Sequence, residues 1–133
     1  MQVPSFLLRR LYVKGSLRNG DNGFAFDLKN SLGSGYAEQV LPLSVDGEEV
    51  PAELASFSVD GTRVPFTDVS SAQPFTLAMN KVVTIGVEGR TLDPGKHKLG
   101  VGFVVTGMGT LQFDVTDVLG AGASESEGSD AAG

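Results

Sequence analysis

Hydrophobic and polar residues alternate with a period of two along most of this chain, a pattern typical of β-strands that bury one face. The clearest alternating segments are residues 11–17, 24–28, 41–45, 57–59, 83–87, 99–105 and 111–115. No stretch of twelve residues keeps the 3.6-residue period of an amphipathic helix. Only residues 52–55, directly after Pro51, have room for a short helical turn. The pattern therefore predicts an all-β chain.

Two nearly identical octets lie in the middle of the chain, at residues 44–51 (SVDGEEVP) and 58–65 (SVDGTRVP). Asp-Gly favours the type I′ turn of a tight hairpin, because both central residues of that turn need a positive φ. The octets are too short and too isolated for a repeat architecture, which needs at least three units. We therefore expect two consecutive hairpin turns with the same turn chemistry.

Together these signals predict an antiparallel β-sandwich, Ig-like or jelly-roll-like, of about eight or nine short strands. We expect an N-terminal arm over residues 1–10, the sandwich over residues 11–118, and a disordered tail rich in Gly, Ala, Ser and acidic residues over 119–133. Residues 6–8 (FLL) lie outside the alternating strands. They are expected either to dock on a partner or to pack on their own domain.

Composition narrows the function classes. The net charge is −6, and half of it comes from Glu125, Glu127 and Asp130 in the tail. The chain offers no basic stripe for a phosphate backbone, so nucleic-acid binding is not expected. It has no cysteine, no apolar run long enough to span a membrane and no signal-peptide pattern. We therefore expect a cytoplasmic protein that binds neither nucleic acid nor membranes.

Candidate catalytic and metal-binding residues are few. His97 is the only histidine, and we expect it to be structural, with a pKa lowered by its two lysine neighbours. Asp46, Glu48 and Glu49 are the densest acidic cluster, but they lack the spacing and loop length that a Ca²⁺ site needs. They are expected to form a solvated turn.

The glycine pairs and tyrosines also lack a functional context. Gly100-x-Gly102 and Gly107-x-Gly109 lie within or at the end of strands, with no helix after them to make a phosphate site. The first pair is expected to let another element pack closely. Only Tyr12 and Tyr36 could form an aromatic platform for sugars. The sequence thus predicts no catalytic, cofactor-binding or metal-binding residue in this chain.

Four segments nevertheless resemble a known family. They are residues 23–26 (GFAF), 43–51 (LSVDGEEVP), 57–61 (FSVDG) and 92–97 (LDPGKH), and the resemblance spans roughly residues 11–117. In order and type they are similar to the small β subunits of bacterial C-glycoside deglycosidases. The Gly-Ser-rich residues 30–36, the N-terminal arm and the acidic tail depart from that pattern.

This resemblance implies a non-catalytic subunit of a heteromeric lyase of carbohydrate metabolism. Its partner would be a TIM-barrel α subunit that holds a divalent metal, typically Mn²⁺. That complex would cleave the C–C bond of a 3-keto-C-glycoside by elimination, with metal and base on the barrel. No cofactor and no catalytic residue would belong to this chain.

Two other function classes stay open at this point. An Ig-like binding or adhesion module, including a carbohydrate-binding one, would have a similar strand and turn pattern. A stand-alone hydrolase would have to use His97, although no nucleophile motif accompanies it.

Overall fold

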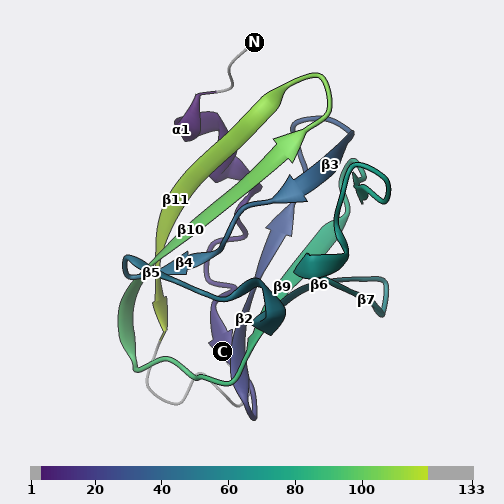
Figure 1. The fold of residues 1–133 in the computed structure, drawn as a ribbon. Coiled ribbons are helices and arrows are strands. Elements are labelled where there is room, and N and C mark those ends of the chain that lie inside the picture. The colour runs from purple at the N-terminus through teal and green to yellow at the C-terminus, as the bar shows by residue number, and fades with distance from the viewer. Residues whose placement is uncertain (1–3, 120–133) are drawn as a thin grey trace.

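The computed structural model describes residues 4–119 of the chain and shows two antiparallel sheets packed against each other (Figure 1). Neither sheet closes into a barrel within these residues. The first sheet has the order β1 (Arg18–Asn19), β2 (Gly23–Lys29), β9 (Val82–Glu88), β6 (Ala55–Val59) and β7 (Thr62–Pro65). The second has the order β5 (Glu48–Glu49), β4 (Ser44–Val45), β10 (Gly95–Val105), β3 (Gly35–Val40) and β8 (Phe75–Leu77), with β11 (Gly109–Leu119) paired to β10.

The β10–β11 hairpin is the longest element of the fold. Its register runs from Gly95 opposite Leu119 to Val105 opposite Gly109. Gly107 and Gly109 close the connecting turn with φ values of 82° and 85°, which a residue with a side chain rarely adopts. Because β11 occupies one edge of β10 throughout, β4 and β3 share the other edge at successive positions.

Both Asp-Gly turns are confirmed. Asp46 and Gly47 have φ values of 54° and 87°, and Asp60 and Gly61 have 51° and 83°. These positive values at both central positions fit the type I′ turn, whose twist matches that of the flanking strands. The first turn joins β4 to β5, and the second joins β6 to β7.

Four short helical turns accompany the strands: α1 (Ser5–Leu8), η1 (Arg9–Leu11), η2 (Ala52–Leu54) and η3 (Phe66–Asp68). The predicted turn after Pro51 is confirmed as η2. The sequence did not predict α1, which follows Pro4 and packs against β11. Leu8 is only 2 % exposed, so the N-terminal arm packs on its own domain, while Phe6 stays 64 % exposed.

One hydrophobic core fills the space between the sheets. Phe57 lies at its centre, with ring centroids 4.2 Å from Phe75 and 4.6 Å from Phe66. The close packing expected at the Gly100 pair is confirmed. A β-carbon at Gly100 would overlap the Ser44 hydroxyl, and one at Gly102 would lie 2.7 Å from a methyl group of Leu41. These glycines therefore let β4 and the segment before it lie against β10.

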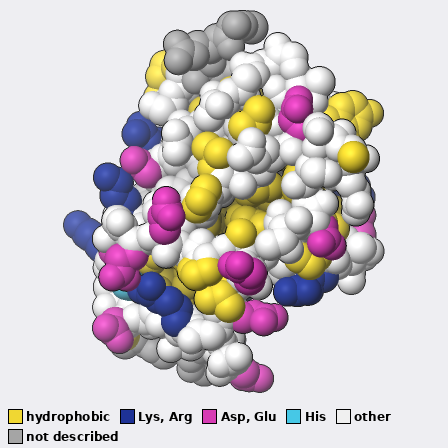
Figure 2. Space-filling model, in the orientation of Figure 1, with side chains coloured by type: hydrophobic (Ala, Val, Ile, Leu, Met, Phe, Trp, Pro, Cys, Tyr) yellow, Lys and Arg dark blue, Asp and Glu magenta, His cyan; other side chains and the backbone are white. Residues whose placement is uncertain are grey.

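Among the described residues the structure has more strands than the eight or nine predicted, because short strands such as the two-residue β1 count as separate elements. The strands β4 and β5 form the hairpin expected around the first Asp-Gly turn. β11 ends at Leu119, which is buried, and the rest of the predicted tail lies outside the described residues. No helix among residues 4–119 has the length and apolar character needed to cross a membrane. On the face in Figure 2, apolar side chains reach the surface in the middle, and acidic and basic side chains lie around them without forming one basic stripe.

Candidate functional site

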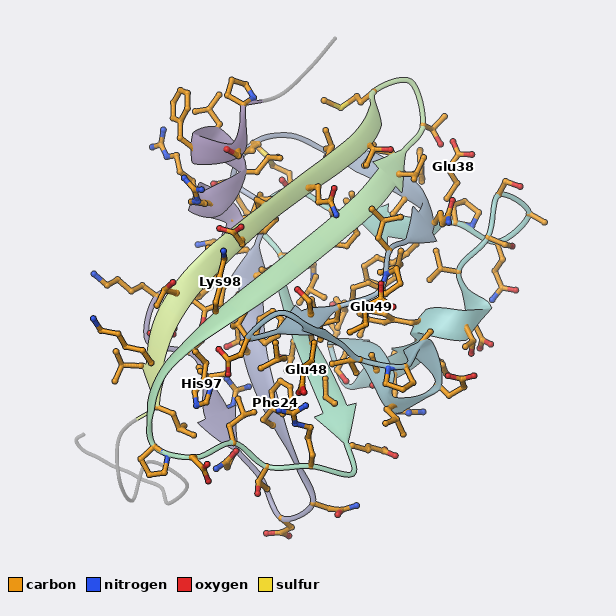
Figure 3. The ribbon with its side chains drawn as sticks, turned by 60° about the vertical axis from the view of Figure 1, so that its left-hand side comes forward. Phe24, Glu38, Glu48, Glu49, His97 and Lys98 are labelled. Atoms are coloured by element: carbon orange, nitrogen blue, oxygen red, sulfur yellow. The ribbon has the colours of Figure 1, made fainter. Side chains whose placement is uncertain are left out.

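His97 is held at the start of β10 by two acceptors. Its Nδ1 lies 2.7 Å from Asp46 Oδ2, and its Nε2 lies 2.6 Å from the carbonyl oxygen of Asp93. The other carboxylate oxygen of Asp46 accepts a hydrogen bond from the backbone N–H of Lys98 at 2.8 Å. Figure 3 shows Lys98 and, below it, His97, both lower in the view than the N-terminal helical turns.

This geometry favours the protonated form of the His97 ring. The carbonyl oxygen of Asp93, and then the Asp46 carboxylate, raise the pKa of His97 above its ordinary value. The N–H of Lys98, and then His97, lower the pKa of Asp46. The prediction that the neighbouring lysines lower the pKa of His97 was therefore wrong, since direct hydrogen bonds outweigh charges on exposed side chains. Both ring nitrogens face an acceptor of the chain, so neither is open toward a substrate or a metal.

The acidic cluster of the first Asp-Gly turn does not converge on one point. Asp46 faces His97 and Lys98, whereas Glu48 pairs with Arg90 at 3.3 Å. Among residues 4–119 no group of three or more His, Cys, Asp or Glu side chains could hold a metal ion. Asp46 is therefore more than a solvated turn residue, because it ties the β4–β5 hairpin to β10.

Asp117 is a buried carboxylate that the sequence did not single out. It is 7 % exposed, and its Oδ2 accepts hydrogen bonds from the Tyr12 hydroxyl at 2.5 Å and the Gly15 N–H at 3.0 Å. Burial, and then the hydrogen bond to Asp117, raise the pKa of Tyr12. Tyr12 is thus committed to the fold and offers no sugar platform, which leaves Tyr36, 55 % exposed, without a tyrosine partner. Asp117 ties the N-terminal segment to β11.

An apolar cavity of about 400 Å³ lies at the opposite end of the β10–β11 hairpin. Its walls come from both sheets and from the N-terminal helical turns. The lining residues are Leu7, Leu8, Leu11, Leu28, Asn30, Leu32, Gly33, Ser34, Gly35, Phe57, Phe75, Leu77, Ala78, Val83, Phe103, Val105, Met108, Leu111 and Phe113. None of them is charged, and the volume is within the range of small-molecule sites, about 300–1,000 Å³.

The cavity reaches the surface between two connections. Leu32 and Met108, which line it, are 42 % and 37 % exposed. Leu32 belongs to the loop between β2 and β3, and Met108 to the turn between β10 and β11. These two connections, with α1 beside them, lie at the upper end of the molecule in Figure 1.

Asn30 holds the loop at this mouth. Its amide nitrogen donates to the carbonyl oxygens of Gly33 and Leu77, at 2.6 and 3.1 Å, and its side-chain oxygen accepts from the N–H groups of Leu32 and Gly33. Both ends of the Asn30 amide are therefore engaged within the chain. Asn30 therefore shapes the mouth of the cavity with polar atoms that are already paired within the chain.

No pattern in the sequence marks this cavity. Inward-facing residues such as Leu28, Val83 and Val105 alternate in the same way whether their side chains meet or leave a space between them. The one available sign was the apolar arm at residues 6–8, which supplies Leu7 and Leu8 to the lining. These residues reach the cavity because they form the helix α1, which packs against β11 and which the hydrophobic pattern did not predict.

Comparison with known proteins corrects the predicted family. The family model described as hydroxymethylglutaryl-CoA reductase, N-terminal domain, matches residues 7–120, and no curated protein matches the chain. This match overturns both the C-glycoside deglycosidase assignment and the lyase function drawn from it. The four segments behind that assignment are strand and turn signatures, which specify hairpins and recur in unrelated two-sheet folds. A barrel partner with Mn²⁺ remains a prediction only. The chain belongs to the family of hydroxymethylglutaryl-CoA reductase N-terminal domains.

Proposed function

We propose that this chain is a non-catalytic binding domain whose cavity takes up an apolar small molecule. The observation that carries the proposal is the uncharged, almost wholly apolar lining of a cavity of about 400 Å³ that opens to the surface at Leu32 and Met108. Burial of apolar ligand surface in such a cavity is favourable, at roughly 25 cal/mol per Å². The two packed sheets fit the Ig-like or jelly-roll-like sandwich expected from the sequence, and that finer assignment is part of this proposal.

The polar groups support a non-catalytic role. His97 and Asp46 are hydrogen-bonded to each other, and Asp117 accepts hydrogen bonds from the Tyr12 hydroxyl and the Gly15 N–H. A general base needs an open position within hydrogen-bond reach of a substrate proton. The hydrogen bonds of His97 occupy both of its ring nitrogens, so it does not provide that position.

Binding of an environment-sensitive apolar dye tests the proposal. N-phenyl-1-naphthylamine is suitable because the chain has no tryptophan to interfere with its fluorescence. We expect saturable binding of one dye molecule per chain, together with a rise in the melting temperature, since a ligand that binds only the folded state stabilises it. A folded chain that shows no saturable dye fluorescence contradicts the proposal.

A second candidate function is favoured by the family match. We propose that the chain also supports the catalytic part of a hydroxymethylglutaryl-CoA reductase without holding the substrate itself. Hydroxymethylglutaryl-CoA carries a carboxylate and phosphates, whereas no charged residue lines the cavity. The purified chain is therefore expected to show no reduction of hydroxymethylglutaryl-CoA, and to form a complex with a reductase polypeptide from the same source by size exclusion. Full reductase activity of the chain alone contradicts this second proposal.

A further inference from the structure

We infer that the occupant of the cavity is one extended, unbranched aliphatic chain. This inference rests on the proposed binding function and names the chemical class of the ligand. It follows from the shape of the cavity, the composition of its walls and the place of its mouth.

The cavity is a slot that runs across the strands. On the second sheet its lining comes from four neighbouring strands at the hairpin tip, namely β11, β10, β3 and β8. Neighbouring strands lie about 4.8 Å apart, so the slot is about 14 Å long. Along the hairpin, the lining runs from Phe103 and Val105 to Met108 in the turn, where the cavity opens to the surface.

The volume and the lining agree with an aliphatic occupant of that length. A cavity of about 400 Å³ has room for it, and small-molecule sites are typically about 300–1,000 Å³. A sugar ring fits poorly, because its hydroxyl groups would lose their hydrogen bonds to water without finding partners.

The walls provide the contacts that an aliphatic chain needs. Leu28 and Val83, paired across β2 and β9, face the slot from the first sheet, and Leu111 faces it from β11. Such side chains bind methylene groups without directional requirements. No charged residue lines the mouth. A polar head group at the end of the chain would therefore remain in water beside Leu32 and Met108.

Displacement of N-phenyl-1-naphthylamine by primary alkanols of increasing length tests the inference. We expect the affinity to rise about fourfold for each added methylene group, the factor that corresponds to ~0.8 kcal/mol per buried methylene. The rise should stop near about twelve carbons, when the extended chain fills the slot of about 14 Å. Fatty acids of the same length should bind equally well, because the head group does not contact the lining.

A matched pair of variants locates the site. Ala78→Phe places a ring in the slot, and we expect it to weaken dodecanol binding at least about tenfold. Ala25→Phe is the matched control. Ala25 lies on β2 between the inward-facing Phe24 and Phe26, so its side chain points away from the cavity, and the substitution should leave binding unchanged. If thermal unfolding shows that Ala78→Phe does not fold, Leu111→Trp, near the mouth on β11, serves in its place.

The outcomes separate the two proposals. If the dye binds and alkanols displace it with the expected length dependence, the inference holds. If the dye binds but alkanols do not displace it, or if 2-naphthol and branched alcohols compete as well as dodecanol, the aliphatic assignment is wrong and the binding function stands. Equal loss of binding in Ala78→Phe and Ala25→Phe also overturns the inference. If the dye does not bind, both proposals fail.

Discussion

The two ends of the β10–β11 hairpin use their side chains in opposite ways. At the end that contains Gly95 and Leu119, His97 and Asp117 make hydrogen bonds that join distant segments of the chain. At the end that contains Val105 and Gly109, apolar side chains from both sheets surround a cavity. At the first end the polar groups are hydrogen-bonded within the chain. At the second end the apolar side chains leave a cavity between them.

This difference teaches where function is to be sought in a chain with few reactive residues. Titratable side chains that look like candidates for chemistry, His97 first among them, are the ones that hold the fold together. The leucines, valines and phenylalanines that look like ordinary core residues line the candidate site.

Replacement of Asp117 should have the largest effect on stability. Asp117→Ala removes the acceptor of the part-buried Tyr12 hydroxyl and Gly15 N–H and of the buried Leu17 N–H. We expect the free energy of unfolding in urea to fall by about 3 kcal/mol, because hydrogen bonds to a charged group are strong and their loss leaves unsatisfied donors. Tyr12→Phe removes one of these bonds and should cost about 1 kcal/mol. Equal, small losses in both variants would mean that Asp117 does not anchor the N-terminal segment.

The two Asp-Gly turns provide a matched pair of variants, because Asp46 and Asp60 have the same backbone conformation but different hydrogen-bond partners. Asp46→Ala and Asp60→Ala carry the same cost of a positive φ at a residue other than glycine. Asp46 also bonds His97 and the Lys98 N–H, whereas Asp60 pairs only with the exposed Lys81. We expect Asp46→Ala to lower the free energy of unfolding by about 1 kcal/mol more than Asp60→Ala. No difference between the two variants in urea denaturation would show that the bonds to β10 contribute nothing.

The stabilising effect of His97 should depend on pH. The pKa of His97 is raised in the folded state, so its contribution is complete below the unfolded value of about 6.5 and is lost as the pH rises through the folded value. The pKa of Asp46 is lowered, so its contribution exists above about pH 4 and is lost on further acidification. We expect His97→Ala to destabilise the chain more at pH 5.5 than at pH 9 in urea denaturation. A larger effect at pH 9 would contradict this assignment.

The smallest effect on stability is expected at the mouth of the cavity. Leu32→Ser and Met108→Ser change partly exposed side chains and should alter the free energy of unfolding by no more than about 0.5 kcal/mol. Each should nevertheless weaken dodecanol binding, since both side chains line the cavity. Thermal unfolding and dye displacement measure the two quantities on the same samples. Unchanged binding in both variants would place the entrance elsewhere.

The sequence predicted the parts of the fold that depend on local rules. Period-two alternation identified β2, β9, β10 and β11, and Asp-Gly identified both type I′ turns, because strand pleating and positive φ are properties of neighbouring residues. It missed α1, whose four residues are too few to show a helical period. It predicted the β4–β5 hairpin but not the pairing of β4 with β10, where Gly100 leaves room for the Ser44 side chain.

The candidate site was beyond sequence reasoning for a different reason. The part-buried hydrogen bond from Tyr12 to Asp117 joins residues 105 positions apart, and nothing local marks either partner. The cavity is still harder to predict, because it depends on how far side chains from opposite sheets reach. The resemblance to a C-glycoside deglycosidase subunit relied on hairpin signatures alone and therefore described turns and not function.

Methyl NMR of the chain with dodecanol tests the central claim most directly, since it observes both ends of the hairpin at once. We predict chemical-shift changes and ligand contacts at the methyl groups of Leu28, Val83 and Val105, which line the cavity, and none at Val45 and Leu92 near the polar end. Shifts confined to Val45 and Leu92, or spread equally over both ends, would contradict the claim that the binding function lies in the apolar cavity.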